Sequence, residues 1–222
     1  MRNRELSPRS SACNAEPDSW SAADLRAAIR SEVESIDPLD ALELQHRSEV
    51  LAWVDSGAPL FRTARPATPP QHLVSYFAVV DEENILLVDH KNAQLWLPPG
   101  GHVEEGEHPR ATVAREIREE LGFAPDHEIA APLMLTCTRT VGLSSGHNDV
   151  SLWYVVNVGK TQGMTYDNQE FNGIRWFELS EVPLQRSDPH LERFIRKLRA
   201  DKTQMRHSAH PPGGASPCDM PR

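Results

Sequence analysis

The sequence contains little cysteine and no long apolar run, and each shortage excludes a class of protein. Its 222 residues include 3 cysteines, Cys13, Cys137 and Cys218, which follow no motif spacing. An odd, unpatterned set argues against a disulfide scaffold and indicates unpaired thiols in a reducing compartment. No apolar run approaches the length of a membrane span, and the N-terminus lacks the apolar core of a signal peptide. We therefore expect a cytoplasmic protein with no membrane partner.

Basic residues are also in short supply. The chain has 23 lysines and arginines against 32 aspartates and glutamates, for a formal net charge of −9. This deficit argues against a large nucleic acid as a partner, because such binding depends on a basic surface. A small nucleotide is compatible with it, because a bound metal ion can neutralise the phosphates locally. The composition leaves a homodimer open.

Composition and hydrophobic periodicity divide the chain into five parts. The two ends are polar, so we expect them to be disordered. Ahead of the main domain, apolar residues at helical spacing are followed by a stretch with four prolines, which is typical of a linker. The expected parts are a disordered N-terminal segment at 1–19, an N-terminal helical extension at 20–57, a Pro-rich linker at 58–71, the main domain at 72–200 and a disordered C-terminal tail at 201–222.

Within the main domain, runs of apolar and β-branched residues predict strands that flank one helix and precede another. The clearest pattern is the strict apolar alternation from 150 to 158. The predicted strands are 73–80, 85–88, 132–141, 150–158 and 174–179, and the predicted last helix includes 191–198. This order favours an α/β/α sandwich around a mixed β-sheet.

One acidic helix carries most of the chemical information. At about 100° per residue, Glu116, Glu119 and Glu120 fall on one face of it, opposite an apolar face. Pro109 suits its first turn and Gly122 suits its end. Crowded carboxylates repel one another unless a cation lies between them. Because Mg²⁺ prefers carboxylate oxygens, the pattern predicts a magnesium site, in which Mn²⁺ can substitute, and it points to phosphate chemistry.

The same segment resembles the signature of the Nudix hydrolases: Gly, five residues, Glu, seven residues, Arg-Glu-apolar, one residue, Glu-Glu, one residue, Gly-apolar. Every fixed position matches without a gap. These positions are Gly101, Glu107, Arg115, Glu116, Ile117, Glu119, Glu120, Gly122 and Phe123. The resemblance covers about 72–200 and implies the α/β/α sandwich of that family, with the N-terminal helices outside its common core.

The resemblance implies metal ligands within the box. Glu116 and Glu120 become the principal ligands, and Glu119 a further ligand, directly or through water. The main-chain carbonyl of Gly100, just ahead of Gly101, would complete the set. Bound there, a magnesium ion would activate water for attack on a phosphoryl group.

The resemblance also implies that Arg115 pairs with Glu107 and holds the glutamates in position, which makes Arg115 part of the catalytic machinery and gives Glu107 and Gly101 a supporting role. The alternative for Arg115 is an exposed helix pair with Glu119, four residues further on.

Glu170 is the candidate general base. Many members of the family place a further acid on a loop outside the box, and Glu170 precedes the predicted strand at 174–179 as such a loop residue would. Asp167, Asp149 and Glu116 itself are alternatives. A plain solvated glutamate is a further alternative for Glu170.

Substrate-contacting residues are harder to identify. Tyr76, Phe77, Trp96 and Trp153 are candidates to stack on a base, although aromatic residues in strands more often belong to a core. His147 precedes the alternating strand and is a candidate phosphate contact, with simple exposure as the alternative.

Three functions fit these observations. We favour a Mg-dependent pyrophosphohydrolase that cleaves a plain or modified nucleoside triphosphate to the monophosphate and pyrophosphate, because no added motif for diphosphosugars is present. The second is hydrolysis of a nucleoside diphosphate linked to another group, such as a nucleotide sugar or ADP-ribose. The third is a non-catalytic binding or sensor module, which the complete set of box glutamates and the lack of a basic patch disfavour. In each case the partner is a small nucleotide derivative.

Overall fold

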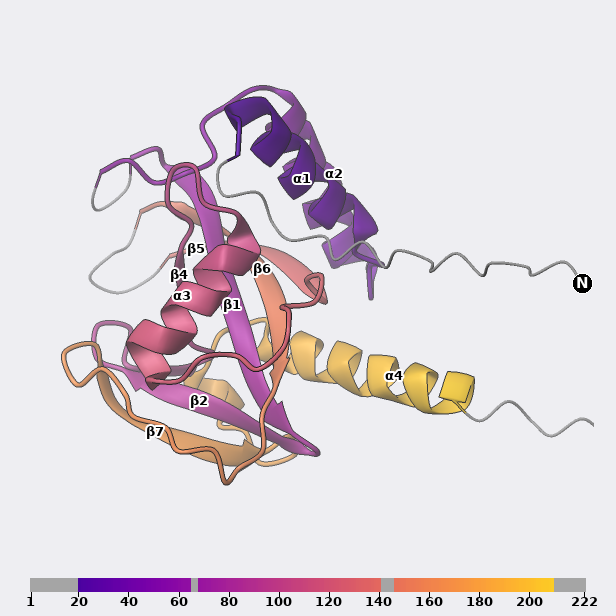
Figure 1. The fold of residues 1–222 in the computed structure, drawn as a ribbon. Helices are drawn as coiled ribbons and strands as arrows, with labels where there is room; N and C mark the ends of the chain where they lie inside the picture. Colours follow the sequence, from indigo (N-terminus) through magenta and orange to yellow (C-terminus); the bar gives the residue numbers. More distant parts are fainter. Residues whose placement is uncertain (1–19, 65–67, 141–145, 210–222) are drawn as a thin grey trace, which may run out of the picture.

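A seven-stranded mixed sheet lies between two layers of helices in the computed structural model, which describes residues 20–64, 68–140 and 146–209 (Figure 1). This arrangement confirms the α/β/α sandwich. The predicted disorder of 1–19, and of the tail beyond 209, lies outside the described residues, as do Cys13 and Cys218; Cys137 is a free thiol.

The sheet is organised around its long first strand. The strands are β1 Gln71–Asp81, β2 Asn84–His90, β3 Leu95–Leu97, β4 Gly100–His102, β5 Met134–Arg139, β6 Asn148–Asn157 and β7 Phe171–Glu178. The order is β3-β2-β1-β6-β5, with β4 added to β1 and β7 to β2. β1 and β6 run parallel, whereas β2 and β4 are antiparallel to β1. The predicted strands are all present. β3 and β4 were not predicted, because three residues are too few to show a period.

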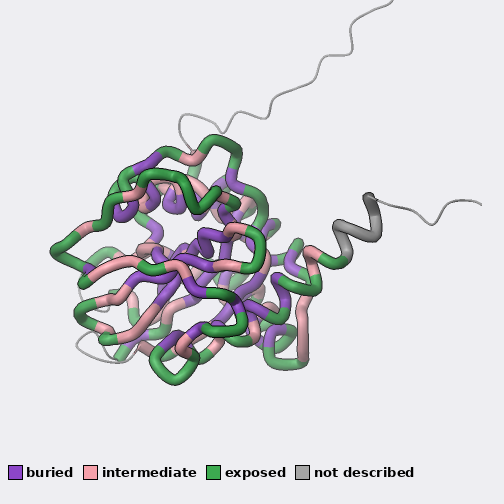
Figure 2. Tube along the Cα trace, turned by 90° about the horizontal axis from the view of Figure 1, so that it is seen from below, coloured by how far each residue is buried: buried purple, intermediate pink, exposed green. Residues whose placement is uncertain are grey.

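Helices cover both faces of the sheet. They are α1 Ala22–Ser35, α2 Ala41–Asp55, α3 Pro109–Leu121 and α4 Leu191–Ala209, with a short 3-10 helix, η2, at Leu184–Arg186. Alternate residues of β1 face opposite layers: Phe77 and Val79 pack with α1, α2 and α3, whereas Ala78 and Val80 pack with α4. Figure 2 shows the buried parts of the trace gathered inside a rim of exposed loops.

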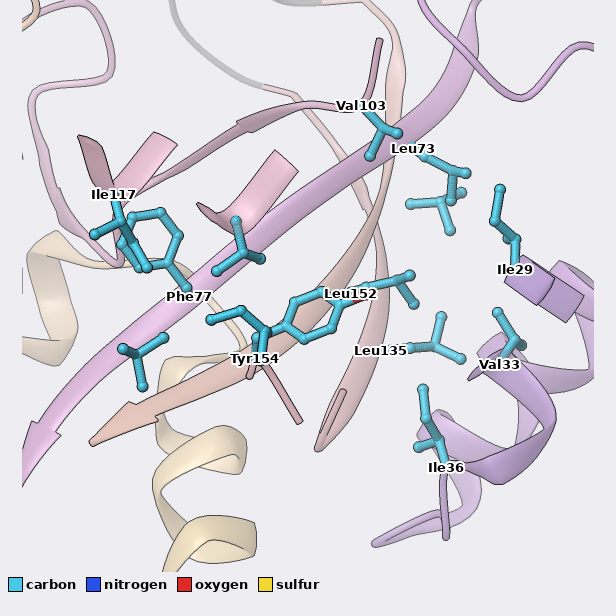
Figure 3. Packing of buried hydrophobic residues seen from close by; sticks show 14 of the residues in the cluster. Ile29, Val33, Ile36, Leu73, Phe77, Val103, Ile117, Leu135, Leu152 and Tyr154 are labelled. Carbon is cyan, nitrogen blue, oxygen red and sulfur yellow. The ribbon is translucent and has the colours of Figure 1, made fainter. Parts of the chain in front are cut away.

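The two N-terminal helices share the core of the main domain. Figure 3 shows Ile29 and Val33 of α1 pointing towards Leu135 and Leu152 of the sheet, and all four side chains are buried. The buried carboxylate of Glu32 in α1 binds Arg110 of α3 and, at 2.6 Å, the hydroxyl of Tyr154 in β6. Glu43 of α2 accepts a hydrogen bond from Lys197 of α4 at 2.6 Å. The segment predicted as an extension is therefore packed against both α3 and α4. Partners this distant in the chain leave no local pattern in the sequence.

The last helix is longer than predicted. α4 continues to Ala209, beyond residue 201, where the tail was expected to begin. Polar composition suggested a tail there, but the stretch contains no glycine or proline to end a helix, and the Thr203 hydroxyl donates to the Arg199 carbonyl at 2.8 Å. Across the described ranges, none of the helices combines the length and the apolar character needed to cross a bilayer.

Candidate active site and metal centre

The predicted metal ligands line a pocket of about 700 Å³. Its walls include parts of β1 to β4, the C-terminal half of α3, the end of β5 and the start of β6, together with the segments 62–64, 170–171 and 188–189. Gly100, Gly101, Glu116, Glu119, Glu120 and Glu170 all belong to this lining. The structure therefore brings together the box, which is local in sequence, and Glu170, which is not.

Helix α3 directs its glutamates towards the pocket because capping residues fix its two ends and an apolar face packs against the sheet. His108 caps it, with Nδ1 accepting from the Arg110 N–H at 3.2 Å, and Pro109 follows in the first turn. Gly122 ends it in the left-handed conformation, at φ 70°, as predicted. Ile117 and Leu121 are fully buried. Anchoring this apolar face against the sheet turns the acidic face towards the pocket.

Two glycines allow the chain to approach the helix closely. A Cβ on Gly101 would lie 1.8 Å from Oε1 of Glu116, inside the carboxylate itself. Gly100 has φ 152°, and a Cβ there would lie 2.2 Å from the Ser75 carbonyl oxygen. The Gly100 N–H donates to Oε2 of Glu120 at 3.0 Å. Only glycine fits at these two positions, which lie against Glu116 and Glu120, the two predicted principal ligands.

Arg115 connects the supporting residues to the predicted ligands. Its guanidinium donates to the two carboxylate oxygens of Glu107 at 3.0 and 3.1 Å, to Glu116 at 2.7 Å and to Glu119 at 3.1 Å. The Glu107 pair and the alternative Glu119 pair are thus both present. Burial raises the pKa of Glu107, but hydrogen bonds from Arg115 and Thr112 outweigh this effect and lower it.

Glu116 and Glu120 both have raised pKa values. Burial raises the pKa of Glu116 despite its contact with Arg115. The pKa of Glu120 is raised well above its usual range by burial and then by the charges of Glu116 and Glu170. Glu119 differs, because its side chain is 59% exposed at the rim. A divalent cation would relieve the repulsion between the carboxylates of Glu116 and Glu120.

Glu170 is the acid that approaches the box from outside. Its side chain is 45% exposed, and Oε1 lies 3.4 Å from Nε2 of His90 at the end of β2. Its negative charge raises the pKa of both Glu116 and Glu120. The charge of Asp167 also raises the pKa of Glu120, but Asp167 does not line the pocket. Its carboxylate accepts a hydrogen bond from the Gln169 N–H at 2.8 Å.

The aromatic candidates are separated by the structure. Tyr76 lines the pocket, whereas Phe77 and Trp153 are fully buried in the two opposite core layers. Trp153 donates its indole N–H to Thr136 at 3.0 Å, and Trp96 packs against a phenylalanine in the α4 layer. Phe77 and Trp153 are therefore not available to stack on a ligand, because the two-residue period of a strand directs them into the core.

His147 lies in the pocket lining but is buried rather than exposed. It belongs to a cluster with His72, His102 and Asp149 whose ligand atoms all lie within 4.8 Å of one another. Asp149, an alternative base in the sequence analysis, is therefore placed among histidines rather than beside the box carboxylates.

Several lining residues were not identified from the sequence. They are Arg62, His102, Arg139 and Asp188. Burial raises the pKa of Asp188 to about 6. Each comes from a different segment and carries no motif. Only the folded sheet brings them together.

Comparisons with known proteins identify the family of this chain. A family model described as NUDIX domain matches residues 70–198. The Bacillus subtilis protein named Uncharacterized Nudix hydrolase YvcI is 27% identical over 121 residues, which are 52% of this chain and 73% of that protein. B. subtilis YjhB, whose provisional name is ADP-ribose pyrophosphatase, is 48% identical over 46 residues, or 21% of this chain and 22% of that protein.

A solved structure of similar fold is a MutT NUDIX hydrolase from Burkholderia pseudomallei, with 24% identity and a TM-score of 0.49 over 57% of this chain and 97% of that one.

Proposed function

Because the chain belongs to the Nudix hydrolase family, and is therefore a hydrolase of pyrophosphate bonds, we propose that it cleaves a nucleoside triphosphate to the monophosphate and pyrophosphate, with Mg²⁺ as its cofactor. One observation carries the proposal. The carboxylates of Glu116, Glu120 and Glu170, from two separate segments, line one pocket and influence one another electrostatically.

The donors in the pocket fit a hard divalent cation. Glu116 and Glu120, together with the Gly100 carbonyl, would hold it, and Glu119 at the rim would add a ligand directly or through water. Oxygen donors of this kind suit Mg²⁺, and Mn²⁺ is expected to substitute. When bound, such a cation cancels phosphate charge and lowers the pKa of water.

The side chains around these ligands would position the reacting groups. Arg115, itself held by Glu107, fixes the carboxylate of Glu116. Glu170 is the proposed general base: its exposed carboxylate takes a proton from the attacking water, and the adjacent His90 restrains it. Because phosphoryl transfer depends mainly on positioning and charge, this set can supply the main requirements of the reaction.

A triphosphate is the favoured substrate because the pocket lining includes a positively charged side chain that does not bind the box glutamates. Arg139, an exposed residue at the end of β5, lines the same pocket. Its guanidinium can bind the phosphate oxygens that a metal ion leaves uncovered, and a triphosphate has more of these than a diphosphate. Tyr76, which also lines the pocket, is the remaining predicted aromatic contact for the rest of the substrate.

A second candidate is a nucleoside diphosphate linked to another group. It is favoured by the likeness to YjhB, whose provisional name refers to ADP-ribose. The matched stretch is short, so the test must include this class of substrate.

The test is a panel of nucleoside triphosphates, nucleotide sugars and ADP-ribose, each incubated with Mg²⁺, in which pyrophosphate and monophosphate products are measured separately. We expect pyrophosphate from triphosphates, and no turnover by the Glu120→Gln control. AMP from ADP-ribose with no pyrophosphate from any triphosphate would favour the second candidate.

Arg139→Gln sharpens the choice. It should raise KM for a triphosphate about tenfold, the value of one charge-assisted hydrogen bond, and affect ADP-ribose less. Arg118→Gln is the matched control, because Arg118 is an exposed arginine of α3 outside the pocket lining.

A further inference from the structure

A second set of ligating side chains lies where β1, β4 and β6 meet. His72 is in β1, His102 ends β4, and His147 and Asp149 stand at the start of β6. The sheet register brings them together, because His72 pairs with Asp149 across the parallel strands and Val74 pairs with His102. Three of the four line the active-site pocket.

Among the described residues, two facing atoms at the centre of this cluster have no hydrogen-bond partner. His72 is fully buried, and its Nδ1 lies 2.9 Å from the Pro69 carbonyl. A carbonyl only accepts, so Nδ1 carries a proton, and Nε2 of the neutral imidazole keeps a lone pair that can bind a metal ion. That Nε2 lies 3.4 Å from Oδ1 of Asp149, and neither atom has a hydrogen-bond partner among the described residues.

A second imidazole points at the same oxygen. Nε2 of His147 lies 3.3 Å from Oδ1 of Asp149, while its Nδ1 lies 3.2 Å from the Thr140 hydroxyl. Two imidazole nitrogens and a carboxylate oxygen thus converge at one buried point. An anion would be repelled there by Asp149, whereas a cation would satisfy all three groups.

From this geometry we infer that His72, His102, His147 and Asp149 bind a transition-metal ion of the Zn²⁺ type. Three imidazoles and one carboxylate are a tetrahedral donor set for zinc. They differ from the all-oxygen set of the proposed magnesium site at Gly100, Glu116 and Glu120, which we call the glutamate centre. The hydrogen bond from His72 to the Pro69 carbonyl is the outer contact that zinc-bound histidines usually make.

The proposed site has one competing cation and one link to the box. Nη1 of Arg62 lies 3.1 Å from Nε2 of His102, so this guanidinium competes with a metal ion for that nitrogen. The carbonyl of His102 accepts a hydrogen bond from Arg115 at 3.3 Å, and Arg115 also contacts Glu116. A metal ion on His102 would therefore restrain the strand that supports the glutamate centre. The inference itself does not depend on the proposed substrate.

Metal binding is tested directly on the full chain, without an affinity tag and stripped with a chelator. Co²⁺ is added in the presence of excess Mg²⁺, which occupies the glutamate centre, and visible absorption is followed before and after displacement by Zn²⁺. Bound zinc is counted by elemental analysis. We expect one ion per chain, a tetrahedral Co²⁺ spectrum, and a rise in melting temperature with Zn²⁺.

Asp149→Asn and His147→Gln should weaken Zn²⁺ binding at least about tenfold, since even the loss of an outer contact commonly has that effect. His127→Gln, which changes an exposed histidine outside the cluster, and Glu120→Gln should bind as the unaltered chain does. Asp149→Asn keeps the size of the side chain, and circular dichroism checks its fold. Undiminished affinity in Asp149→Asn, or no cobalt spectrum in the unaltered chain, would overturn the inference.

Arg62→Gln separates a cation site from an anion site. Removing the competing guanidinium should leave Zn²⁺ binding equal or tighter. If inorganic phosphate instead bound at the cluster, lost affinity in Arg62→Gln, and excluded Zn²⁺, the metal assignment would be wrong.

Discussion

Two buried glutamates in this molecule have opposite surroundings. Glu43 is 0% exposed and Glu120 is 4% exposed. Glu43 accepts from the Lys197 ammonium at 2.6 Å and from two main-chain N–H groups at 2.7 and 3.3 Å. Glu120 accepts from one main-chain N–H at 3.0 Å and is repelled by the like charges of Glu116 and Glu170.

The difference separates a carboxylate that is paired within the fold from one that we propose binds a ligand. A buried charge is costly unless it is paired and hydrogen-bonded, and Glu43 meets that condition within the fold. Glu120 leaves it unmet, which fits a group whose partner is a ligand. Residues of this second kind can be changed with little loss of stability but with a large loss of activity.

The largest expected effect is on the activity of Glu120→Gln. Removing a proposed metal ligand should lower kcat about a thousandfold, or about 4 kcal/mol of activation free energy. The melting temperature of the metal-free protein should stay the same or rise, because one of the repelling charges is lost. Steady-state kinetics with Mg²⁺ and a thermal melt check the two halves; full activity would remove Glu120 from the site.

Glu43→Gln should behave in the opposite way. Breaking a buried pair leaves Lys197 without its countercharge, so we expect a loss of about 3 kcal/mol in the free energy of unfolding, measured by urea denaturation. The kcat of the folded fraction should be unchanged. Adding Lys197→Met to Glu43→Gln should recover part of the loss; if it recovers none, the pair is not the cause.

Glu170→Ala tests whether the loop acid is catalytic. A general base contributes about a hundredfold or more, so kcat should fall by that amount with little change in stability. Asp167→Ala, which changes a neighbouring acid outside the pocket lining, is the control and should have a small effect. Equal, mild effects of both changes would make Glu170 a bystander.

The smallest expected effect concerns Asp40, a structural carboxylate at the surface end of α2. It caps that helix through the Glu43 N–H at 3.0 Å and pairs with Arg193 of α4 at 2.6 Å. Asp40→Ala should cost about 1 kcal/mol of stability, and Asp40→Asn, which keeps the cap, should cost less. Urea denaturation of both variants at pH 7 checks this order.

The same residue sets a pH dependence. The Arg193 guanidinium, together with the helix cap, holds the pKa of Asp40 well below its ordinary value. A depressed pKa means that the charged form stabilises the fold above the ordinary value of about 3.9 and that the contribution is lost as the pH falls below it. The gap between the unaltered chain and Asp40→Asn should therefore narrow between about pH 4 and pH 2. A gap that stays constant would rule out the ion pair.

How much could be predicted follows from how local each feature is. Helical spacing and the terminal residues are enough to predict the ends of α3 and its two faces. The acidic face turns Glu116 towards the pocket, and the apolar face turns Ile117 towards the core. The strands of the main domain were visible for the same reason. The three-residue strands β3 and β4 were not, although β4 contains the two glycines that lie against Glu116 and Glu120.

Aromatic residues were less predictable than carboxylates. An apolar side chain such as Trp153 fits both a core and a binding surface, and only the packing of α4 decides between them. A charged group such as Glu120 is rarely buried without a partner, so a cluster of such groups on one helix face already indicates a binding site.

The spacing of the box along one helix is enough to indicate the family and to place the box carboxylates on one face, because a helix repeats every few residues. The tertiary structure decided which distant residues share the pocket: Glu170 beside the box, and His72, His102, His147 and Asp149 in a cluster of their own. Parallel pairing of β1 with β6, strands far apart in the chain, creates that cluster. No local periodicity encodes such a pairing, because it arises from the burial of two strands in one sheet.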